Sequence, residues 1–247
     1  MTNNSLVIRN ATIVDGTGAD PFKGDVALEN GIIKEVGTVE NNYNDEIDAK
    51  GLILAPGFID IHTHFDPQLC WDGYATPSIE HGVTTVVTGN CSLSLAPIRN
   101  GGEEKIISMF QVIEDIKKPT FDAAVPFSWE TFGEYLDHIK PNLGINVGAL
   151  IGHSAVRLYV MGEDSQKRKA TDEEIKQMCE IVEQSMEQGA LGVSSSYVDV
   201  DENFDPVPSR FSCKKEKIEL ARAATKTGRG VWQVVPYFID METQLKN

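Results

Sequence analysis

The stretch ILAPGFIDIHTH, residues 53–64, decides the predicted fold. Residues 53–61 form a nearly continuous apolar run, which is typical of a strand that is buried on both faces of a parallel sheet. Similar runs recur at residues 83–88, 147–151, 191–194 and 231–235, and segments with helical periodicity separate several of them. Strands that alternate with helices predict an α/β fold whose parallel sheet is covered on its faces.

The clearest predicted helix covers residues 172–188. Thr171 can cap its first turn, and Glu174, three residues further on, completes a capping box. Apolar side chains at positions 175, 178, 179, 182 and 186 share one face of this helix. Further helices are predicted near residues 103–116, 129–139 and 213–227.

Residues 1–55 differ from the rest of the chain, because they contain short β-branched segments and tight turns. Strand-like runs at residues 25–29 and 32–36 flank Asn30 and Gly31. An Asn-Gly pair at this spacing predicts a hairpin, since both central positions of a type I′ turn need a positive φ. We therefore expect a small β-module in residues 1–55, followed by five strand–helix units in residues 56–247.

The composition excludes several classes of function. The chain has 247 residues, of which 41% are hydrophobic, and its formal net charge is −15. Binding to nucleic acid depends on clustered Lys and Arg side chains, which this acidic sequence lacks, so we expect no such partner. No apolar run is long enough to cross a bilayer, and the N-terminus lacks the features of a secretory signal. We therefore expect a cytoplasmic protein with no membrane partner.

Two histidines follow the first apolar strand. Alternate residues of an extended chain point to the same side, so His62 and His64 can both project from the carboxyl end of this strand. In a β/α barrel the active site lies at that end of the strands. Because neutral imidazoles are good ligands for zinc and similar divalent ions, we predict a metal site here. The alternative is that both histidines are polar loop residues without a metal.

Cys91 follows the next strand, in the sequence Gly89-Asn90-Cys91. A thiolate is a strong zinc ligand, and the two strands are expected to be neighbours, so Cys91 can reach the same ion as the histidines. A lone cysteine is otherwise most often buried and inert. We predict His62, His64 and Cys91 as metal ligands, with zinc, as one or two ions, as the expected cofactor.

Polar residues also follow two later strands. His153 and Arg157 come after residues 147–151, and a guanidinium group pairs bidentately with a carboxylate, so both are candidates for binding a small-molecule substrate. Ser195 and Tyr197 follow the strand at 191–194 and are candidates for the same role. The alternatives are a structural histidine with a surface arginine, and serines that cap the following turn.

Taken together, these motifs resemble the amidohydrolase superfamily and, within it, the N-acyl-D-amino-acid deacylase (D-aminoacylase) family. The resemblance covers essentially the whole chain. It rests on the segments APGFIDIHTH at 55–64, HGVTTVVTGNC at 81–91, LAP at 95–97, WETFGEYLD at 129–137, GHSAVR at 152–157, VMG at 160–162 and GALGVSSS at 189–196.

This resemblance implies a fold and an activity. The implied fold is an incomplete TIM-like (β/α) barrel, preceded by a module that forms part of a composite β-sandwich. The implied activity is hydrolysis of the amide bond of an N-acyl-D-amino acid, which is a carbon–nitrogen bond but not a peptide bond. His62, His64 and Cys91 match the family's metal ligands, and in the family an aspartate from the last barrel strand is the general base.

Two departures from the family pattern bear on the activity of this chain. The family places a metal-binding histidine on the fifth strand, where this sequence has VWQVV at 231–235, and Val235 stands in the ligand's place. The sixth-strand histidine and the general-base aspartate are expected beyond residue 247. We therefore expect the chain to be the front portion of a longer enzyme, with little or no activity alone.

Two other functions remain open on the sequence. One is a related amidohydrolase with a cyclic amide substrate, such as a dihydroorotase or hydantoinase. The Gly89-Asn90-Cys91 motif disfavours it, because those relatives usually use a carbamylated lysine. The other is a catalytically dead barrel fragment, for which we expect no bound zinc. The sequence does not indicate an oligomeric state.

Overall fold

The computed structural model describes residues 5–237 of the chain. The chain divides into two compact units, one that ends at Gly57 and one that begins at Phe58. We call these the N-terminal unit and the C-terminal unit. Each has a five-stranded sheet and buried apolar clusters of its own.

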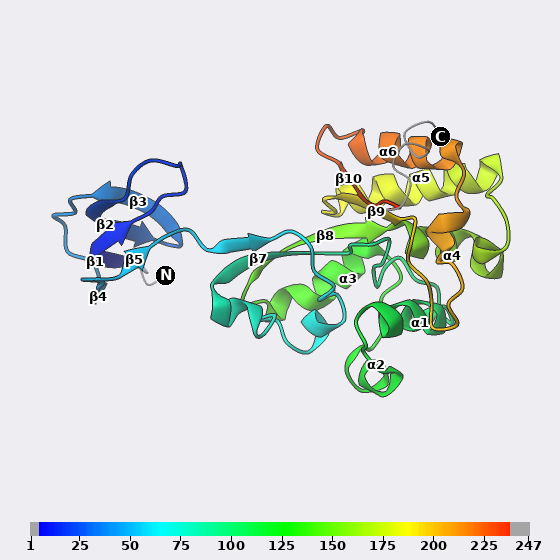
Figure 1. The fold of residues 1–247 in the computed structure, drawn as a ribbon, viewed down its shortest axis with the longest axis horizontal. Helices are drawn as coiled ribbons and strands as arrows, with labels where there is room; N and C mark the ends of the chain where they lie inside the picture. The colour runs from blue at the N-terminus through cyan, green and yellow to red at the C-terminus, as the bar shows by residue number, and fades with distance from the viewer. Residues whose placement is uncertain (1–4, 238–247) are drawn as a thin grey trace. The chain divides into compact units, whose positions relative to one another are not determined.

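The N-terminal unit is built on one mixed sheet (Figure 1). Strand β1 lies inside it, antiparallel to β2 on one side and parallel to β4 and β5 on the other. The strands are β1 (Ser5–Ile13), β2 (Phe22–Glu29), β3 (Ile32–Gly37), β4 (Asp45–Asp48) and β5 (Ile53–Leu54). The described residues of this unit thus form a small β-module around a single sheet.

The predicted hairpin is confirmed. Strands β2 and β3 pair antiparallel on either side of Asn30 and Gly31, and these two residues have positive φ angles of 51° and 77°. An asparagine tolerates this left-handed conformation and a glycine adopts it without steric cost. The local sequence alone therefore places this turn.

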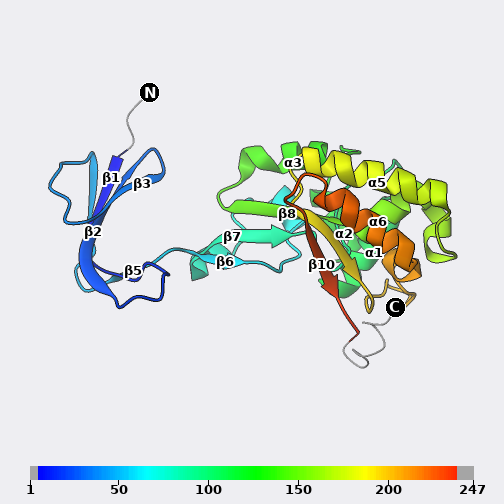
Figure 2. The same cartoon turned by 90° about the horizontal axis from the view of Figure 1, so that it is seen from above.

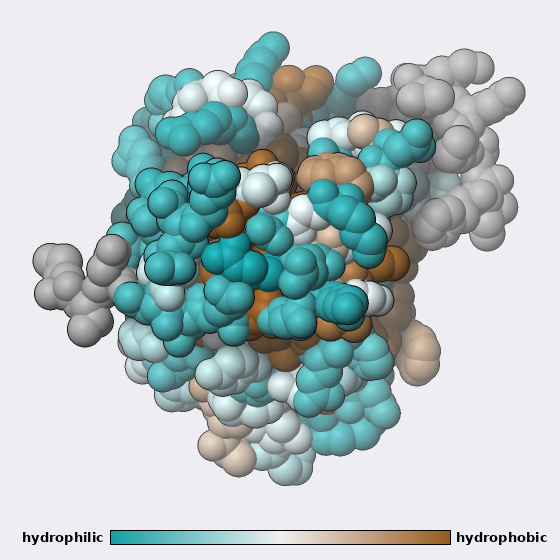
Figure 3. All heavy atoms as spheres, turned by 90° about the vertical axis from the view of Figure 1, so that its left-hand side faces the viewer, coloured by the Kyte–Doolittle hydropathy of each residue, from teal (hydrophilic) through white to brown (hydrophobic). Residues whose placement is uncertain are grey.

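Large apolar side chains remain exposed on the N-terminal unit. Ile32, Ile33 and Val36 of β3 have exposed fractions of 60%, 61% and 49%. Figure 3 shows hydrophobic residues between the hydrophilic side chains of this face. The sheet of this unit therefore leaves several large apolar side chains exposed.

The C-terminal unit contains a curled parallel sheet with the strand order β10-β9-β8-β7-β6 (Figure 2). Its strands are β6 (Phe58–Asp60), β7 (Val83–Thr88), β8 (Asn146–Gly152), β9 (Gly192–Ser196) and β10 (Val231–Val235). Its α-helices are α1 (Glu103–Ile113), α2 (Lys118–Ala124), α3 (Phe132–Ile139), α4 (His153–Met161), α5 (Asp172–Glu187) and α6 (Lys214–Thr225). Short 3₁₀-helices are η1 (Gln68–Cys70), η2 (Ser78–His81), η3 (Lys140–Asn142), η4 (Gly162–Gln166) and η5 (Pro208–Phe211). The predicted α/β class with a parallel sheet is confirmed.

The apolar run at residues 53–61 does not form one strand, so that prediction was wrong. Pro56 and Gly57 interrupt it: β5 pairs with β1 in the N-terminal unit, whereas β6 pairs with β7 in the C-terminal unit. The run is not buried on both faces either, since Ile53 and Ile59 are 72% and 64% exposed. A proline lacks the N–H that a continuous strand would need here.

Helix α5 has the predicted start. The Thr171 hydroxyl accepts the backbone N–H of Glu174 at 3.3 Å, and the Glu174 carboxylate accepts the Thr171 N–H at 2.7 Å. This reciprocal capping box satisfies two N–H groups that the first turn would otherwise leave unpaired. On the predicted face, Met178 and Val182 are fully buried in the core of the unit. Helices α5 and α6 lie side by side over the strands (Figure 1).

The side chains of β9 and β10 alternate between the helix layer and the opposite side of the sheet. Trp232 of β10 contacts the ring of His153 in α4, and Ser195 of β9 hydrogen-bonds to the same histidine. Ser194 instead bonds to the loop after β7. Because the strand period is two, Ser196 and Val235 are expected to share the side that Ser194 takes, away from the helices.

Candidate metal centre

The three side chains predicted as metal ligands lie together in the structure. The Nε2 atom of His62 is 3.2 Å from the Sγ atom of Cys91. One potential ligand atom from each of His62, His64 and Cys91 lies within 4.8 Å of the others. Two ligands bound to one zinc ion at about 2.0–2.3 Å lie at most roughly 4.6 Å apart, so the 3.2 Å pair of His62 and Cys91 meets this limit. The 4.8 Å spread of the whole set is just outside it.

Parallel pairing of two strands produces this convergence. In the register of β6 and β7, Asp60 lies beside Val86. Beyond the end of β6, the backbone N–H and the hydroxyl of Thr63 both donate to the carbonyl oxygen of Val87, at 3.0 and 2.9 Å. The histidine segment therefore continues along β7 and reaches the edge of the sheet at which Cys91 follows the end of β7.

The loop that carries Cys91 has an unusual backbone. Cys91 and Ser92 have positive φ angles of 55° and 67°, a conformation that costs about 1–3 kcal/mol for a residue other than glycine. Hydrogen bonds hold it in place. The Asn90 amide donates to the carbonyls of Thr63 and Val87, at 3.1 and 2.9 Å. A strained backbone fixed in this way turns the Cys91 sulfur back toward the histidines.

Gly89 begins this loop, and we expect Gly89→Ala to destabilise the C-terminal unit by about 2–3 kcal/mol. Its φ of +75° is left-handed, and an added Cβ would collide with the carbonyl group of Leu150 in β8. Urea unfolding of the two proteins measures the effect. Gly101→Ala is the matched control, because Gly101 has a φ of +86° but nothing within 4 Å of the added carbon. Equal losses in the two variants would contradict the role of the close approach.

Without a metal, the His64 imidazole and the Cys91 thiol are both uncharged at pH 7. Burial, and then the neighbouring His62, lowers the pKa of His64 to about 4, so this imidazole is neutral at pH 7 and keeps a lone pair. Burial raises the pKa of the Cys91 thiol to about 12, and three nearby carboxylates add to the shift. A metal ion deprotonates a coordinating thiol. The His64 Nδ1 atom is buried and has no hydrogen-bond partner, so the donor set fits a divalent ion.

The three carboxylates belong to Asp66, Glu114 and Asp199, and the sequence assigned no role to any of them. Asp66 is 1% exposed and accepts the Gly89 N–H at 3.1 Å, and burial raises its pKa to about 7. The Oε1 atom of Glu114 lies 4.0 Å from the Nε2 atom of His64. Burial also raises the pKa values of Glu114 and Asp199. Two positions were available signals: Asp66 follows the histidine motif in the sequence, and Asp199 lies just after β9, where polar residues are site candidates.

His153 and Arg157 lie in a buried network instead of facing a ligand. Both have 0% exposure. His153 bonds through Nε2 to the Glu216 carboxylate at 2.7 Å and through Nδ1 to the Ser195 hydroxyl at 3.0 Å. The Arg157 guanidinium bonds to Glu216 at 2.6 Å and to the backbone carbonyls of Ser165 and Arg168. In this structure the carboxylate that Arg157 binds is therefore one from the protein.

The other two predicted substrate contacts have different surroundings. Ser195 is fully buried and points to the helix layer, where His153 contacts it. Tyr197 is half-buried beyond the end of β9, and the Lys217 ammonium lies 4.0 Å from the centre of its ring. The structure thus separates these residues: Ser195 is internal, and Tyr197 retains an accessible position at the carboxyl end of the sheet.

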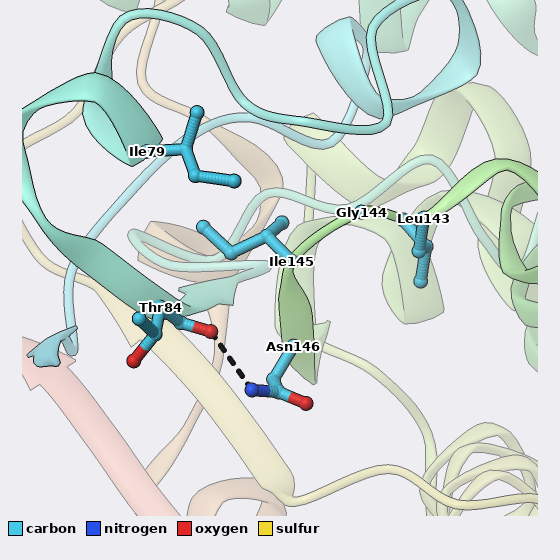
Figure 4. Close-up of a pocket in the computed structure, with 6 residues that line it drawn as sticks. All are labelled: Ile79, Thr84, Leu143, Gly144, Ile145 and Asn146. Atoms are coloured by element: carbon cyan, nitrogen blue, oxygen red, sulfur yellow. Dashed lines mark hydrogen bonds between the residues drawn. The ribbon is translucent and has the colours of Figure 1, made fainter. Parts of the chain in front are cut away.

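A cavity of about 430 Å³ lies at the opposite end of the strands (Figure 4). Thr84 and Asn146 stand near the starts of β7 and β8, and the Asn146 amide donates to the Thr84 carbonyl at 2.9 Å. The remaining lining residues are Ile79, Leu143, Gly144 and Ile145. Because Cys91 follows the other end of β7, this cavity is separate from the candidate metal centre.

The sequence of the chain matches a known enzyme family. The sequence profile of the amidohydrolase family matches residues 45–235. The chain therefore belongs to the amidohydrolase family. Within residues 5–237, none of the helices combines the length and apolar character that crossing a bilayer requires.

The similar proteins include deacylases of D-amino acids. A D-aminoacylase from Alcaligenes xylosoxydans xylosoxydans is 32% identical over 225 residues, which cover 90% of this chain and 42% of that protein. A crystal structure of a D-aminoacylase matches with a TM-score of 0.75 and 30% identity, covering 98% of this chain and 47% of that one. An N-acyl-D-glutamate deacylase from Bordetella bronchiseptica, solved with zinc and a phosphonate inhibitor, matches with a TM-score of 0.73 and 27% identity, covering 93% and 44%. The chain thus spans less than half the length of these relatives.

Proposed function

We propose that this chain is the metal-binding part of an N-acyl-D-amino-acid deacylase, which hydrolyses the amide bond between an acyl group and a D-amino acid. The observation that carries the proposal is the convergence of His62, His64 and Cys91 at the carboxyl edge of the sheet. The names of the relatives supply the substrate class. The Cys91 position also favours this function over a cyclic-amide hydrolase, in which a carbamylated lysine is expected.

His62, His64 and Cys91 would hold zinc. A zinc ion held there would supply Lewis-acid chemistry, lowering the pKa of water to about 7 and polarising an amide carbonyl. The chain's own residues prepare this site: the low pKa of His64 keeps the imidazole neutral, and Asn90 fixes the loop that carries Cys91. Tyr197 is the predicted substrate contact with the most accessible position.

The proposal extends to the fold. The curled sheet of β6–β10 would be the first part of a TIM-like barrel, and the N-terminal sheet would be one layer of a composite β-sandwich. Both β6 and β10 are edge strands among the described residues, and Ile59 and Val231 on them are 64% and 52% exposed. Closing a barrel removes such edges, and the relatives are long enough to supply the missing strands.

Zinc binding and stereochemistry test the function. We expect the purified 247-residue chain to bind zinc, and the zinc-loaded chain to bind phosphonate analogues of N-acetyl-D-amino acids more tightly than the L enantiomers. Calorimetry measures both. Because the general base is expected outside this chain, hydrolysis of N-acetyl-D-amino acids should be slow or absent. A chain that binds no zinc, or that binds L analogues equally well, would contradict the proposal.

A further inference from the structure

Two carboxylates flank the histidine–cysteine cluster from different segments of the chain. Glu114 directly follows α1, and Asp199 lies in the loop after β9. Neither belongs to the set of ligand atoms within 4.8 Å of one another. Both nevertheless interact electrostatically with Cys91. Two negatively charged side chains therefore lie near the cluster without belonging to it.

Glu114 faces His64. Its Oε1 atom is 4.0 Å from the His64 Nε2 atom, and its side chain is 34% exposed. No lysine or arginine forms an ion pair with Glu114 within the described part of the chain. The backbone N–H of Glu114 donates to the Phe110 carbonyl at 2.9 Å, so the end of α1 fixes the position of this residue. The carboxylate therefore presents uncompensated negative charge to the cluster.

Asp199 approaches the cluster from the β9 side. The Ser196 hydroxyl accepts the backbone N–H groups of Val198 and Asp199 at 3.2 and 3.1 Å, which turns the chain just beyond the strand. The Asp199 Oδ2 atom is buried and has no hydrogen-bond partner. The carboxylate interacts with the Ser196 side chain, with the charge of Arg210 and, more weakly, with His62. A buried carboxylate oxygen without a partner is costly unless a positive group compensates it.

These observations converge on a cation. Two of the buried atoms without a hydrogen-bond partner are a carboxylate oxygen of Asp199 and the Nδ1 of His64, whose side chain is only 9% exposed. A divalent ion would satisfy the imidazole nitrogen and offset the charge of both carboxylates. On β10, the valine at 235 cannot offer a ligand atom in place of an imidazole. A carboxylate near a bound cation attracts it with an energy that falls with distance, so Glu114 and Asp199 would add to the hold of the three ligands.

We propose that Glu114 and Asp199 form an electrostatic clamp that retains the divalent ion held by His62, His64 and Cys91. The clamp compensates for the missing imidazole on β10. The inference rests on the proposed metal site but assigns a role to two residues outside it. Glu114 and Asp199 are positioning and charge-compensating residues, because they act on the ion from outside the three-atom cluster.

Metal titration of the full chain tests the clamp. Zn²⁺ affinity is measured against a competing chelator for Glu114→Gln, Asp199→Asn and the double variant. We expect each single amide substitution to weaken binding by about 10-fold and the double variant by about 100-fold, the range seen when residues around a metal ligand are changed. Glu173→Gln and Asp137→Asn, at exposed helix positions, serve as matched controls and should bind as wild type does.

Two further readouts separate a clamp from a structural role. The Co²⁺–thiolate absorption band should keep its position at saturation in the three site variants and in both control variants, because Cys91 remains. The charge-conserving Glu114→Asp and Asp199→Glu should recover most of the lost affinity. If both amide variants bind Zn²⁺ within twofold of wild type, the clamp is wrong and the proposed function stands. If wild type binds no Zn²⁺, the proposed function itself fails.

Discussion

Glu216→Gln is expected to destabilise the C-terminal unit by about 3–5 kcal/mol, the cost of removing one partner of a buried ion pair. Glu216 and Arg157 both have 0% exposure, and the guanidinium of Arg157 donates to both carboxylate oxygens. Glutamine keeps the shape of the side chain but removes its charge. The guanidinium of Arg157 would then stay buried without a counter-charge.

Urea unfolding with and without the substitution measures this loss. Glu219→Gln is the control on the same helix, since Glu219 pairs with Arg222 three residues away at the surface and is 37% exposed. Exposed pairs of this kind contribute only about 0.2–1 kcal/mol. Losses of equal size in the two variants would show that burial of the pair does not matter.

The stability that this ion pair contributes also depends on pH. Burial alone would raise the pKa of Glu216, but the hydrogen bond and charge of His153, together with Arg157, hold it below its ordinary value of 4.5. A carboxylate with a lowered folded pKa contributes stability that is fully present above its unfolded pKa and is lost as the pH falls through the folded value. Wild type should therefore lose stability below about pH 4.5 more steeply than Glu216→Gln does.

Local sequence patterns predicted where turns and helix starts lie, but they did not predict which sheet each strand joins. The turn at Asn30 and the capping box at Thr171 depend on neighbours in the sequence, and both are present. The apolar run at 53–61 gave no sign that its two halves pair with different partners. Hydrophobicity reports that a segment is apolar, but the partner strand is decided by contacts that are distant in the sequence.

The residues of the candidate site also divide into those that local patterns predict and those placed by contacts distant in the sequence. His62 and Cys91 could be selected because parallel strands bring their carboxyl ends to one edge, a rule that needs only strand positions. Arg157 could not be placed in this way, because its partner Glu216 is an ordinary helical glutamate in the sequence. Two roles were considered for Arg157, a surface residue and a ligand for a substrate carboxylate. The structure shows neither, because Arg157 pairs with Glu216 inside the protein. Glu114 and Asp199 likewise reach the cluster only through the tertiary fold.

Cys91→Ala is expected to weaken zinc binding by more than about 100-fold, beyond the range that changes around a ligand produce. Cys91 is the one candidate ligand that becomes an anion, and a neutral pair of imidazoles retains a divalent ion less well than imidazoles with a thiolate. Alanine is small enough to fit the 8% exposed position. The Asn90 amide holds the loop by donating to the backbone carbonyls of Thr63 and Val87, and these hydrogen bonds do not involve the sulfur.

Competition titration with Zn²⁺ and Co²⁺ measures the loss, and the Co²⁺–thiolate band should disappear in Cys91→Ala. Cys213→Ala is the control, because Cys213 lies at the start of α6 and should leave both the affinity and the band unchanged. Thermal unfolding without metal checks that the variant folds. An unchanged zinc affinity in folded Cys91→Ala would mean that the sulfur, although it lies 3.2 Å from the His62 nitrogen, contributes nothing to holding the ion.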